Sequence, residues 1–336
     1  MTAHVPHTGF ARRVLAELAA RLGAEPTPAA VLGARRAAGP AAARRLLAAS
    51  GLEALLVDTG YPPGATTLAE MRAGLPCAVH EIVRVEACAE RLLPAALPYE
   101  AFLDALRAEL EAGARRGVAL KSIIAYRSGL AVRAWPPAEA RAAYRRELAR
   151  SEAGRPPRLT EPALLDTLFV VALEVARDAG RPLQVHTGLG DPDIDLLRAN
   201  PLLLRPLLED PRWAAVPVVL LHLAYPYARE AAFMAAVWPQ VHVDLSLALP
   251  LLGPAAVGLL AEVLALAPAT KVHYGSDLRG LPELFALAAD WARDALGRAL
   301  ATLVEARALT RDEARAVGRR VLADNARALY RLPPSA

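Results

Sequence analysis

The sequence predicts an α/β fold, a (β/α)8 barrel of the TIM type that lacks its first strand and carries an N-terminal helical elaboration. Short apolar runs alternate with longer helical patterns, which implies parallel strands with covering helices. No GxGxxG motif follows the first run and no phosphate-binding loop occurs, which weakens an open nucleotide-binding sheet. The first 50 residues carry helical pattern only, so one strand is missing from the expected eight.

Seven runs have the apolar or β-branched character of strands. They are LEALLVD (52–58), HEIVRVE (80–86), VALKSIIAYR (118–127), PLQVHTG (182–188), VPVVLLHLAY (216–225), VHVDLSL (241–247) and KVHYGSD (271–277).

Helical patterns fill the intervals, and glycine or proline follows several of them, as expected where a helix stops. They cover 10–23, 27–37, 40–50, 66–76, 99–117, 136–151, 160–180, 227–238, 254–267 and 310–332. With no linker or internal repeat in view, we expect an N-terminal helical segment over 1–50 and one barrel domain over 51–332.

Composition excludes several classes of function. Of the 336 residues 54% are hydrophobic and 22% charged, and 35 acidic residues nearly balance 39 basic ones, which is ordinary for a compact soluble chain. No Lys/Arg tract is interleaved with aromatic residues, so nucleic-acid binding is not expected. No uninterrupted apolar run reaches about 18 residues, and the N-terminus lacks a signal-peptide core. We expect a cytoplasmic protein that binds a small molecule and no membrane, with a homo-oligomer left open.

Three predicted strands end in a potential metal ligand: His186, His222 and Asp277. In a parallel barrel the active site lies at the carboxyl ends of the strands, so these side chains would meet there. Two imidazoles and a carboxylate suit a borderline metal such as zinc, with a position left for water. The alternative is that each is a satisfied histidine or a helix-capping aspartate.

Lys121 lies inside a predicted strand, in a chain whose only other lysine is Lys271. A buried ammonium needs a partner, so Lys121 is either a site residue or half of a structural ion pair, with Glu86 as a possible partner.

Charged residues near the strand ends are candidate substrate contacts. Alternation along a strand places Arg84 with Glu86 on one face and Lys121 with Arg127 on another. Guanidinium groups at a barrel mouth could clamp a substrate carboxylate, although surface ion pairs explain the pattern equally well.

The GDPDIDL segment carries Asp191, Asp193 and Asp195 but lacks the glycine and distal glutamate of an EF-hand loop. Asp191 is kept as a substrate-binding candidate, and Asp191 or Asp193 is expected to cap a following helix. The five other histidines are interpreted as structural: His4, His7, His80, His242 and His273.

The whole pattern resembles the amidohydrolase-related family of metal-dependent (β/α)8 barrels, in particular the branch related to a domain fused to glutamine-synthetase-like proteins. The matching stretches lie in order over 55–332: LLVDTGYPP, HEIVRVEACAERLL, ALKSIIAYRSGL, PLQVHTGLGDPDIDL, PVVLLHLAYPYAREAAFMAAVWPQVHVDLSLALP, KVHYGSDLRGLPELF and DNARALYRL.

This resemblance implies roles for individual residues. His186 and His222 correspond to the fifth- and sixth-strand histidines and Asp277 to the eighth-strand aspartate. Lys121 corresponds to a fourth-strand lysine that some relatives carbamylate to bridge two metals, so the resemblance implies four metal-site residues: His186, His222, Asp277 and Lys121. The implied cofactor is a divalent metal, zinc first and manganese second. Asp277 would take a proton from the metal-bound water, and His222 would polarise the scissile carbonyl or orient the water.

The sequence departs from the family at its first strand, which carries a His-x-His pair that is absent here. His4 and His7 have the wrong spacing and precede a helix. Three explanations stay open: a start codon placed too late, which we favour, a degenerate non-catalytic member, or completion of the site by another chain.

The function expected from the resemblance is a metal-dependent hydrolase that cleaves an amide, ester or lactone-like bond in a small polar substrate. A metal-dependent decarboxylase on the same barrel is one alternative. Another is a non-catalytic barrel that binds a partner such as a glutamine-synthetase-like enzyme.

Overall fold

The computed structural model describes residues 3–60, 66–152 and 157–333, and its centre is one sheet of seven parallel strands. The strands are β1 (Ala54–Asp58), β2 (Ala78–Arg84), β3 (Ala119–Ser122), β4 (Leu183–Val185), β5 (Val218–Leu220), β6 (Val241–Asp244) and β7 (Val272–His273). Each pairs with its neighbours in sequence, in the order β1 to β7. Six of the seven predicted runs contain one of these strands, and the run over 80–86 overlaps β2, which begins two residues earlier. The predicted parallel α/β fold is confirmed.

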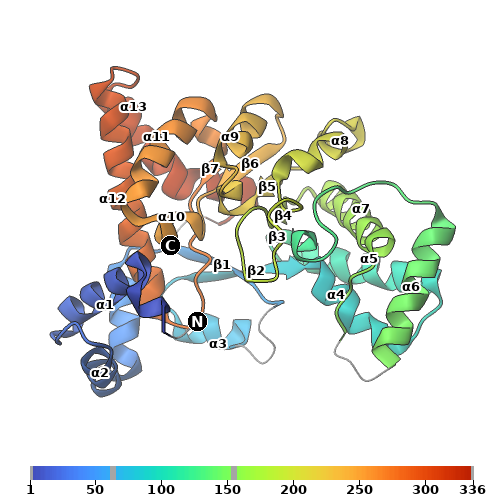
Figure 1. The fold of residues 1–336 in the computed structure, drawn as a ribbon, viewed down its shortest axis with the longest axis horizontal. Coiled ribbons are helices and arrows are strands. Elements are labelled where there is room, and N and C mark those ends of the chain that lie inside the picture. Colours follow the sequence, from blue (N-terminus) through green and yellow to red (C-terminus); the bar gives the residue numbers. More distant parts are fainter. Residues whose placement is uncertain (1–2, 61–65, 153–156, 334–336) are drawn as a thin grey trace.

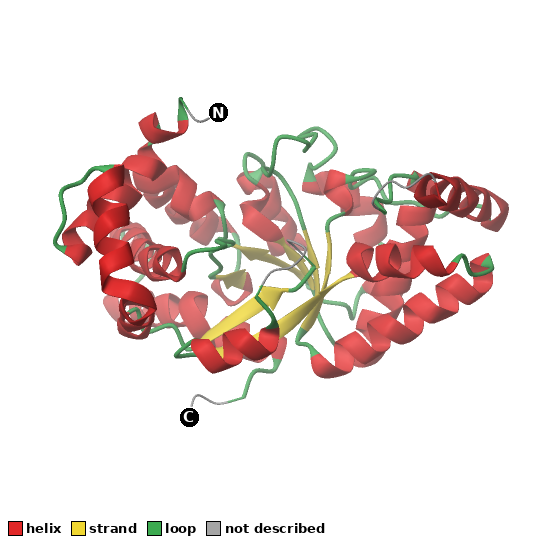
Figure 2. Ribbon diagram, turned by 90° about the horizontal axis from the view of Figure 1, so that it is seen from below, coloured by secondary structure: helices red, strands yellow, loops and turns green. Residues whose placement is uncertain are grey.

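The sheet curls into an open half-barrel with helices around its outside (Figures 1 and 2). Within the described ranges, β1 and β7 each pair with a single strand and are the two edges. This is the arrangement of a TIM barrel that lacks one strand, as predicted.

Fourteen helices are described, and most of them follow a strand on the way to the next one. They are α1 (Gly9–Leu22), α2 (Pro28–Ala49), α3 (Leu68–Gly74), α4 (Val85–Leu92), α5 (Tyr99–Arg116), α6 (Pro137–Glu152), α7 (Pro162–Ala179), α8 (Arg205–Leu208), α9 (Ala228–Val237), α10 (Ala248–Leu252), α11 (Ala256–Leu266), α12 (Pro282–Glu305), α13 (Arg311–Arg319) and α14 (Asn325–Tyr330).

Helix boundaries follow local capping chemistry. Thr67 and Thr310 each form a capping box with the glutamate three residues later, at the starts of α3 and α13. Gly23 and Gly180 end α1 and α7 in the left-handed conformation.

The longest helix, α12, is absent from the predicted elements, although its buried positions recur with helical spacing. The predicted closing helix over 310–332 is also divided, because a π-helical turn at Arg320–Asp324 separates α13 from α14.

The predicted N-terminal helices exist and pack against α12. Trp291 of α12 meets the ring of Phe10 edge to face at 5.9 Å, and its indole N–H donates to Glu17 at 2.6 Å. Arg35 of α2 pairs with the buried Glu283 at 2.6 Å. Leu18 and Val31 join the same hydrophobic core as the barrel helices, so these contacts tie α1 and α2 to the barrel.

One stretch, Ala248–Leu266, is long and apolar enough by composition to cross a membrane, with a mean hydropathy of 1.9. In the structure a turn at Gly253–Ala255 divides it into α10 and α11, and these pack beside α9 and α12.

The inside of the half-barrel is polar below the strand ends, where barrels usually hold branched apolar side chains. Nδ1 of His242 lies 2.9 Å from Nε2 of His273. Tyr330 of α14 enters from below, and its hydroxyl accepts a hydrogen bond from Gln184 at 2.8 Å. Burial lowers the pKa of His242 from 6.5 to about 4 and that of His273 to about 3, so both rings are neutral near pH 7.

Replacing His242 by glutamine tests this polar layer. Burial keeps the His242 ring unprotonated in the folded chain, whereas the unfolded chain binds a proton there below pH 6.5. The contribution of this ring to the free energy of unfolding is therefore complete above pH 6.5 and is lost as the pH falls towards 4. We expect His242→Gln to remove about 2–3 kcal/mol of the acid-induced loss in the free energy of unfolding. Urea unfolding at several pH values measures this, with pH 8 as the reference. Identical pH slopes for parent and variant would contradict the expectation.

Candidate active site

The carboxyl ends of the strands open into a cavity of about 3280 Å³. All but one of the predicted site residues line it: Arg84, Lys121, Arg127, His186, Asp191, His222 and Asp277. The cavity exceeds a typical ligand pocket of about 300–1,000 Å³. It continues along the open side of the half-barrel to Leu56 of β1 and Tyr330 of α14.

His186 follows the last residue of β4 and is buried beneath the cavity. Its ring centroid lies 4.3 Å from that of Tyr126, and its Nδ1 lies 3.1 Å from Nε2 of His222. Nε2 of His186 is buried without a hydrogen-bond partner. At Gly190 a Cβ atom would overlap the Tyr126 hydroxyl and lie 3.0 Å from this Nε2, so the loop closes over the ring only with glycine.

His222 reaches the cavity because the backbone turns sharply after β5. Strand alternation would place the His222 side chain on the opposite face of the sheet from Val219 and Leu221, and so away from the cavity. Instead His222, Leu223 and Ala224 all have positive φ, at 65°, 50° and 48°. Such angles are strained for residues with a Cβ, and they turn the imidazole inward.

Neighbouring loops hold this strained turn. The N–H of His222 donates to Oδ1 of Asp244 at 2.8 Å, and the hydroxyl of Thr187 donates to the carbonyl of Leu221 at 2.6 Å. Gly188 has φ +67°, and a Cβ there would overlap the Ala224 backbone. The loops after β4 and β5 are therefore interlocked and present His186 and His222 together.

Both imidazoles are neutral in this setting. Burial, followed by the nearby His222 and Lys121, lowers the pKa of His186 well below its usual value. Burial and Lys121 lower the pKa of His222 to about 3. Neutral imidazole is the form that binds metals.

Asp277 lies four residues beyond β7, in the left-handed region at φ 51°. Its Oδ2 is 3.8 Å from Nε2 of His222, and its side chain is 41% exposed because it faces the cavity. The walls of the cavity partly desolvate the Asp277 carboxylate, which raises its pKa, while Lys121 opposes this shift.

Lys121 is paired with Asp58 at the end of β1, not with Glu86. Its Nζ lies 3.0 Å from Oδ2 of Asp58, and Nε of Arg84 donates to both oxygens of the same carboxylate at 3.2 and 3.0 Å. Burial alone would raise the pKa of Asp58, but the two cations outweigh it and hold the value at about 2. Asp58 was missed, although it ends a predicted strand just as Asp277 ends another.

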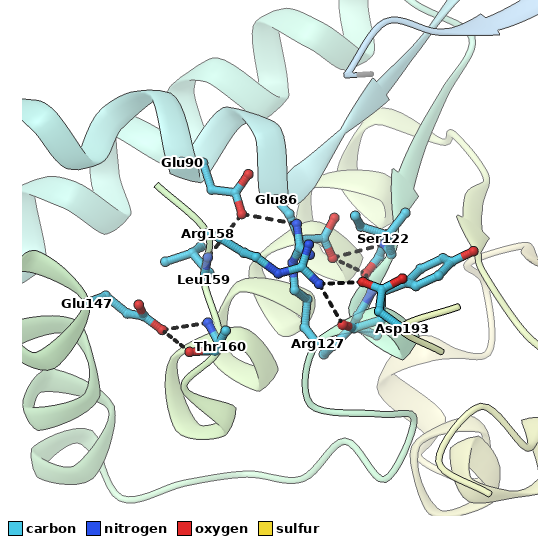
Figure 3. A network of polar contacts seen from close by, with 12 residues as sticks. Glu86, Glu90, Ser122, Arg127, Glu147, Arg158, Leu159, Thr160 and Asp193 are labelled. Atoms are coloured by element: carbon cyan, nitrogen blue, oxygen red, sulfur yellow. Dashed lines mark hydrogen bonds and ion pairs between the residues drawn. The ribbon is translucent and has the colours of Figure 1, made fainter. Parts of the chain in front are cut away.

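Glu86 is the predicted site residue that does not line the cavity. The chain leaves the strand after Arg84, so Glu86 belongs to the first turn of α4 and does not share a strand face with Arg84. It accepts hydrogen bonds from the Ser122 hydroxyl at 2.6 Å and the Ile123 N–H at 3.0 Å, and burial raises its pKa (Figure 3). Glu86 thus supports the end of β3 from below.

Arg127 belongs to a network of ion pairs that fastens the loops beside the cavity (Figure 3). It donates to Oε1 of Glu90 at 3.3 Å, and the same oxygen accepts the Leu159 N–H at 3.0 Å. Arg158 pairs with Asp193 at 2.7 Å. Because Arg127 lies beyond β3, the expectation that it shares a strand face with Lys121 is wrong.

Asp191 lies exposed at the rim, and its N–H donates to the Tyr126 hydroxyl at 3.0 Å. The predicted helix capped by Asp191 or Asp193 is wrong, because turns follow instead. Among these aspartates, the carboxylate of Asp195 accepts a local N–H, that of Leu197 at 3.0 Å.

The donor set suits a divalent metal, but its members do not surround one point. Two neutral histidines and a carboxylate meet pairwise at 3.1 and 3.8 Å. Across the part of the chain that the structure describes, no three His, Cys, Asp or Glu side chains are grouped to hold a metal ion.

Comparisons with known proteins agree with this architecture. The model of a family described as amidohydrolase matches residues 87–332. Protein FluG of Emericella nidulans is 37% identical over 233 residues, which are 65% of this chain and 26% of FluG. The chain thus spans about a quarter of the length of that relative.

Solved structures share the fold. A Lactobacillus casei protein with the provisional name metal-dependent hydrolase has a TM-score of 0.87 at 27% identity, covering 98% of this chain and 86% of that one. A uronate isomerase of Thermotoga maritima has a TM-score of 0.64 at 18% identity, covering 85% of this chain and 69% of that one. A glucuronate isomerase of Caulobacter crescentus has a TM-score of 0.59 at 17% identity, covering 87% and 67%. The two isomerases show the fold alone.

Replacing Asp58 by asparagine tests the buried charge cluster. Lys121 and Arg84 would lose their shared counter-ion in a place where their side chains are only 9% and 15% exposed. We expect the free energy of unfolding to fall by about 3 kcal/mol. The matched control is Asp178→Asn, which breaks an exposed ion pair with Arg177 and should change little. Equal effects of both variants in urea unfolding would show that Asp58 holds no buried charge.

Replacing Gly188 by alanine tests the interlocked loops. Left-handed strain and overlap with the Ala224 backbone act together. We expect a loss of at least about 2 kcal/mol of stability. In the control Gly23→Ala, φ is +63° with nothing within 4 Å, so only the strain of about 1 kcal/mol remains. Thermal and urea unfolding would measure both, and a smaller loss at Gly188 than at Gly23 would refute the interlock.

Proposed function

Because the chain belongs to the amidohydrolase family, we propose that it is a metal-dependent hydrolase that cleaves an amide, ester or lactone-like bond in a small polar substrate. The observation that carries this proposal is the meeting of two neutral buried histidines, His186 and His222, with Asp277 at the floor of a cavity. In parallel barrels the active site lies at the carboxyl ends of the strands, which is where both histidines lie.

The residues that would hold the metal are His186, His222 and Asp277. The buried Nε2 of His186 has no hydrogen-bond partner, as expected for a nitrogen that would coordinate a metal ion. Two imidazoles and one carboxylate are ligands that zinc accepts, with manganese second. A divalent cation there would supply an acidified water and polarise a carbonyl group.

The chain's own side chains then have distinct tasks. Asp277 faces the cavity with a raised pKa, so its Oδ2 is placed to accept a proton from a reacting water. The ammonium of Lys121 is engaged by Asp58, and the proposal therefore assigns Lys121 to this ion pair and gives it no part in holding the metal.

Substrate contacts fall to the rim of the cavity. Arg127 and Asp191 line it together with Tyr126, whose ring covers His186. Arg84 also lines the cavity, but Asp58 engages its guanidinium in two hydrogen bonds, which weakens the idea of a carboxylate clamp at this position.

A barrel that binds a small molecule without hydrolysing it is the second candidate. One observation favours it: within the described ranges, no three potential ligands are grouped around a metal position.

Metal content separates the two candidates. After incubation with zinc or manganese and removal of free metal, we expect about one equivalent per chain, lost in His186→Ala and His222→Ala. His242→Gln is the matched control, because this histidine lies in the layer below and should leave the metal content unchanged. A parent chain that retains no metal would overturn the metal-dependent hydrolase and favour the binding barrel.

Product analysis tests the reaction itself. Small amides, esters and lactones are incubated with the metal-loaded protein in heavy-oxygen water, and hydrolysis must place one heavy oxygen in the acid product. Release of carbon dioxide without this label would contradict hydrolysis.

A further inference from the structure

We propose that Ser246 and Asp244 are positioning residues that fix the tautomer of His222, so that Nδ1 carries the proton and Nε2 is unprotonated. The inference concerns the protonation pattern of the chain itself, and it rests on the proposed function only for its consequence in metal binding. Neither residue is among those that the sequence singled out.

The three side chains form a buried line in the wall of the cavity. Asp244 ends β6 and Ser246 follows two residues later. The Ser246 hydroxyl lies 2.5 Å from Oδ1 of Asp244 and 2.7 Å from Nδ1 of His222. Asp244, Ser246 and His222 are only 8%, 4% and 1% exposed, so water does not compete for these contacts.

Counting donors decides where each proton lies. Oδ1 of Asp244 already receives the N–H of His222 at 2.8 Å and that of Ser246 at 3.3 Å. This oxygen is therefore an acceptor, and the single hydroxyl proton of Ser246 must point to it. The Ser246 oxygen is left to accept from His222, so the imidazole proton lies on Nδ1 and Nε2 is bare.

The same logic extends to the second histidine. The bare Nε2 of His222 lies 3.1 Å from Nδ1 of His186, so His186 donates from Nδ1 and its own Nε2 is bare. That assignment accounts for the buried, unpartnered Nε2 of His186, since an unpaired acceptor nitrogen is tolerated better than a buried N–H without a partner. One chain of hydrogen bonds, from Asp244 through Ser246 and His222 to His186, leaves Nε2 of both histidines without a proton. Nε2 of His186 has no partner, and a cation at Nε2 of His222 would replace the N–H of His186.

Asp244 also holds the backbone on which His222 sits. Its Oδ1 anchors the His222 N–H within the left-handed turn, and its Oδ2 abuts Gly275 after β7, where a Cβ would overlap it. The carboxylate thus couples the loops after β5, β6 and β7, and both ring orientation and tautomer depend on it.

Nuclear magnetic resonance of isotope-labelled histidine in the metal-free protein tests the inference. At neutral pH we expect His222, assigned by loss of its signals in His222→Gln, to show a protonated Nδ1 and a bare Nε2. Ser246→Ala should shift it towards the other tautomer, Ser246→Thr should restore the parent pattern, and Ser276→Ala in the next loop should change nothing. A protonated Nε2 in the parent, or an unchanged tautomer in Ser246→Ala, would overturn the inference.

Zinc affinity measures the consequence separately. Ser246→Ala should weaken zinc binding about 10- to 100-fold, and Ser246→Thr should keep most of it. Equal zinc affinity in parent and Ser246→Ala would overturn the positioning role. A parent that binds no zinc but shows the expected tautomer would refute the proposed function and leave the inference intact. If Ser246→Ala does not fold, the tautomers of the parent and of Ser246→Thr still decide.

Discussion

Parallel pairing of every strand with its sequence neighbour is the constraint on which the rest of the structure depends. It brings the carboxyl ends of all seven strands to one end of the half-barrel. Asp58 and Asp277, which lie far apart in the sequence, therefore reach the same cavity. The crossover helices that parallel pairing requires form the outer layer.

Burial at the carboxyl ends of the strands determines which side chains can be charged. Lys121 and Arg84 share the Asp58 carboxylate as their counter-ion, and they hold its pKa at about 2. The two histidines have no such partner and are neutral. The floor of the cavity therefore combines two cations that share one carboxylate with two uncharged imidazoles.

Backbone strain is concentrated at the turn that carries His222. Three successive residues with positive φ carry the His222 ring inward, and Asp244, Thr187 and the Gly188 contact hold them there. A turn that is unfavourable by itself persists because several neighbouring loops restrain it at once. The strained backbone thus lies within the candidate site, where the side chains need a fixed geometry.

The sequence by itself determined the seven strand positions, their parallel order and three residues of the candidate site, because strand periodicity and residues that end apolar runs are local signals. It did not identify the Asp58 partner of Lys121, the place of Glu86 in α4, or the Asp244–Ser246 support of His222. Those features were decided only by the tertiary structure. They depend on where a strand stops, on a backbone turn that breaks alternation, and on contacts between loops far apart in the chain.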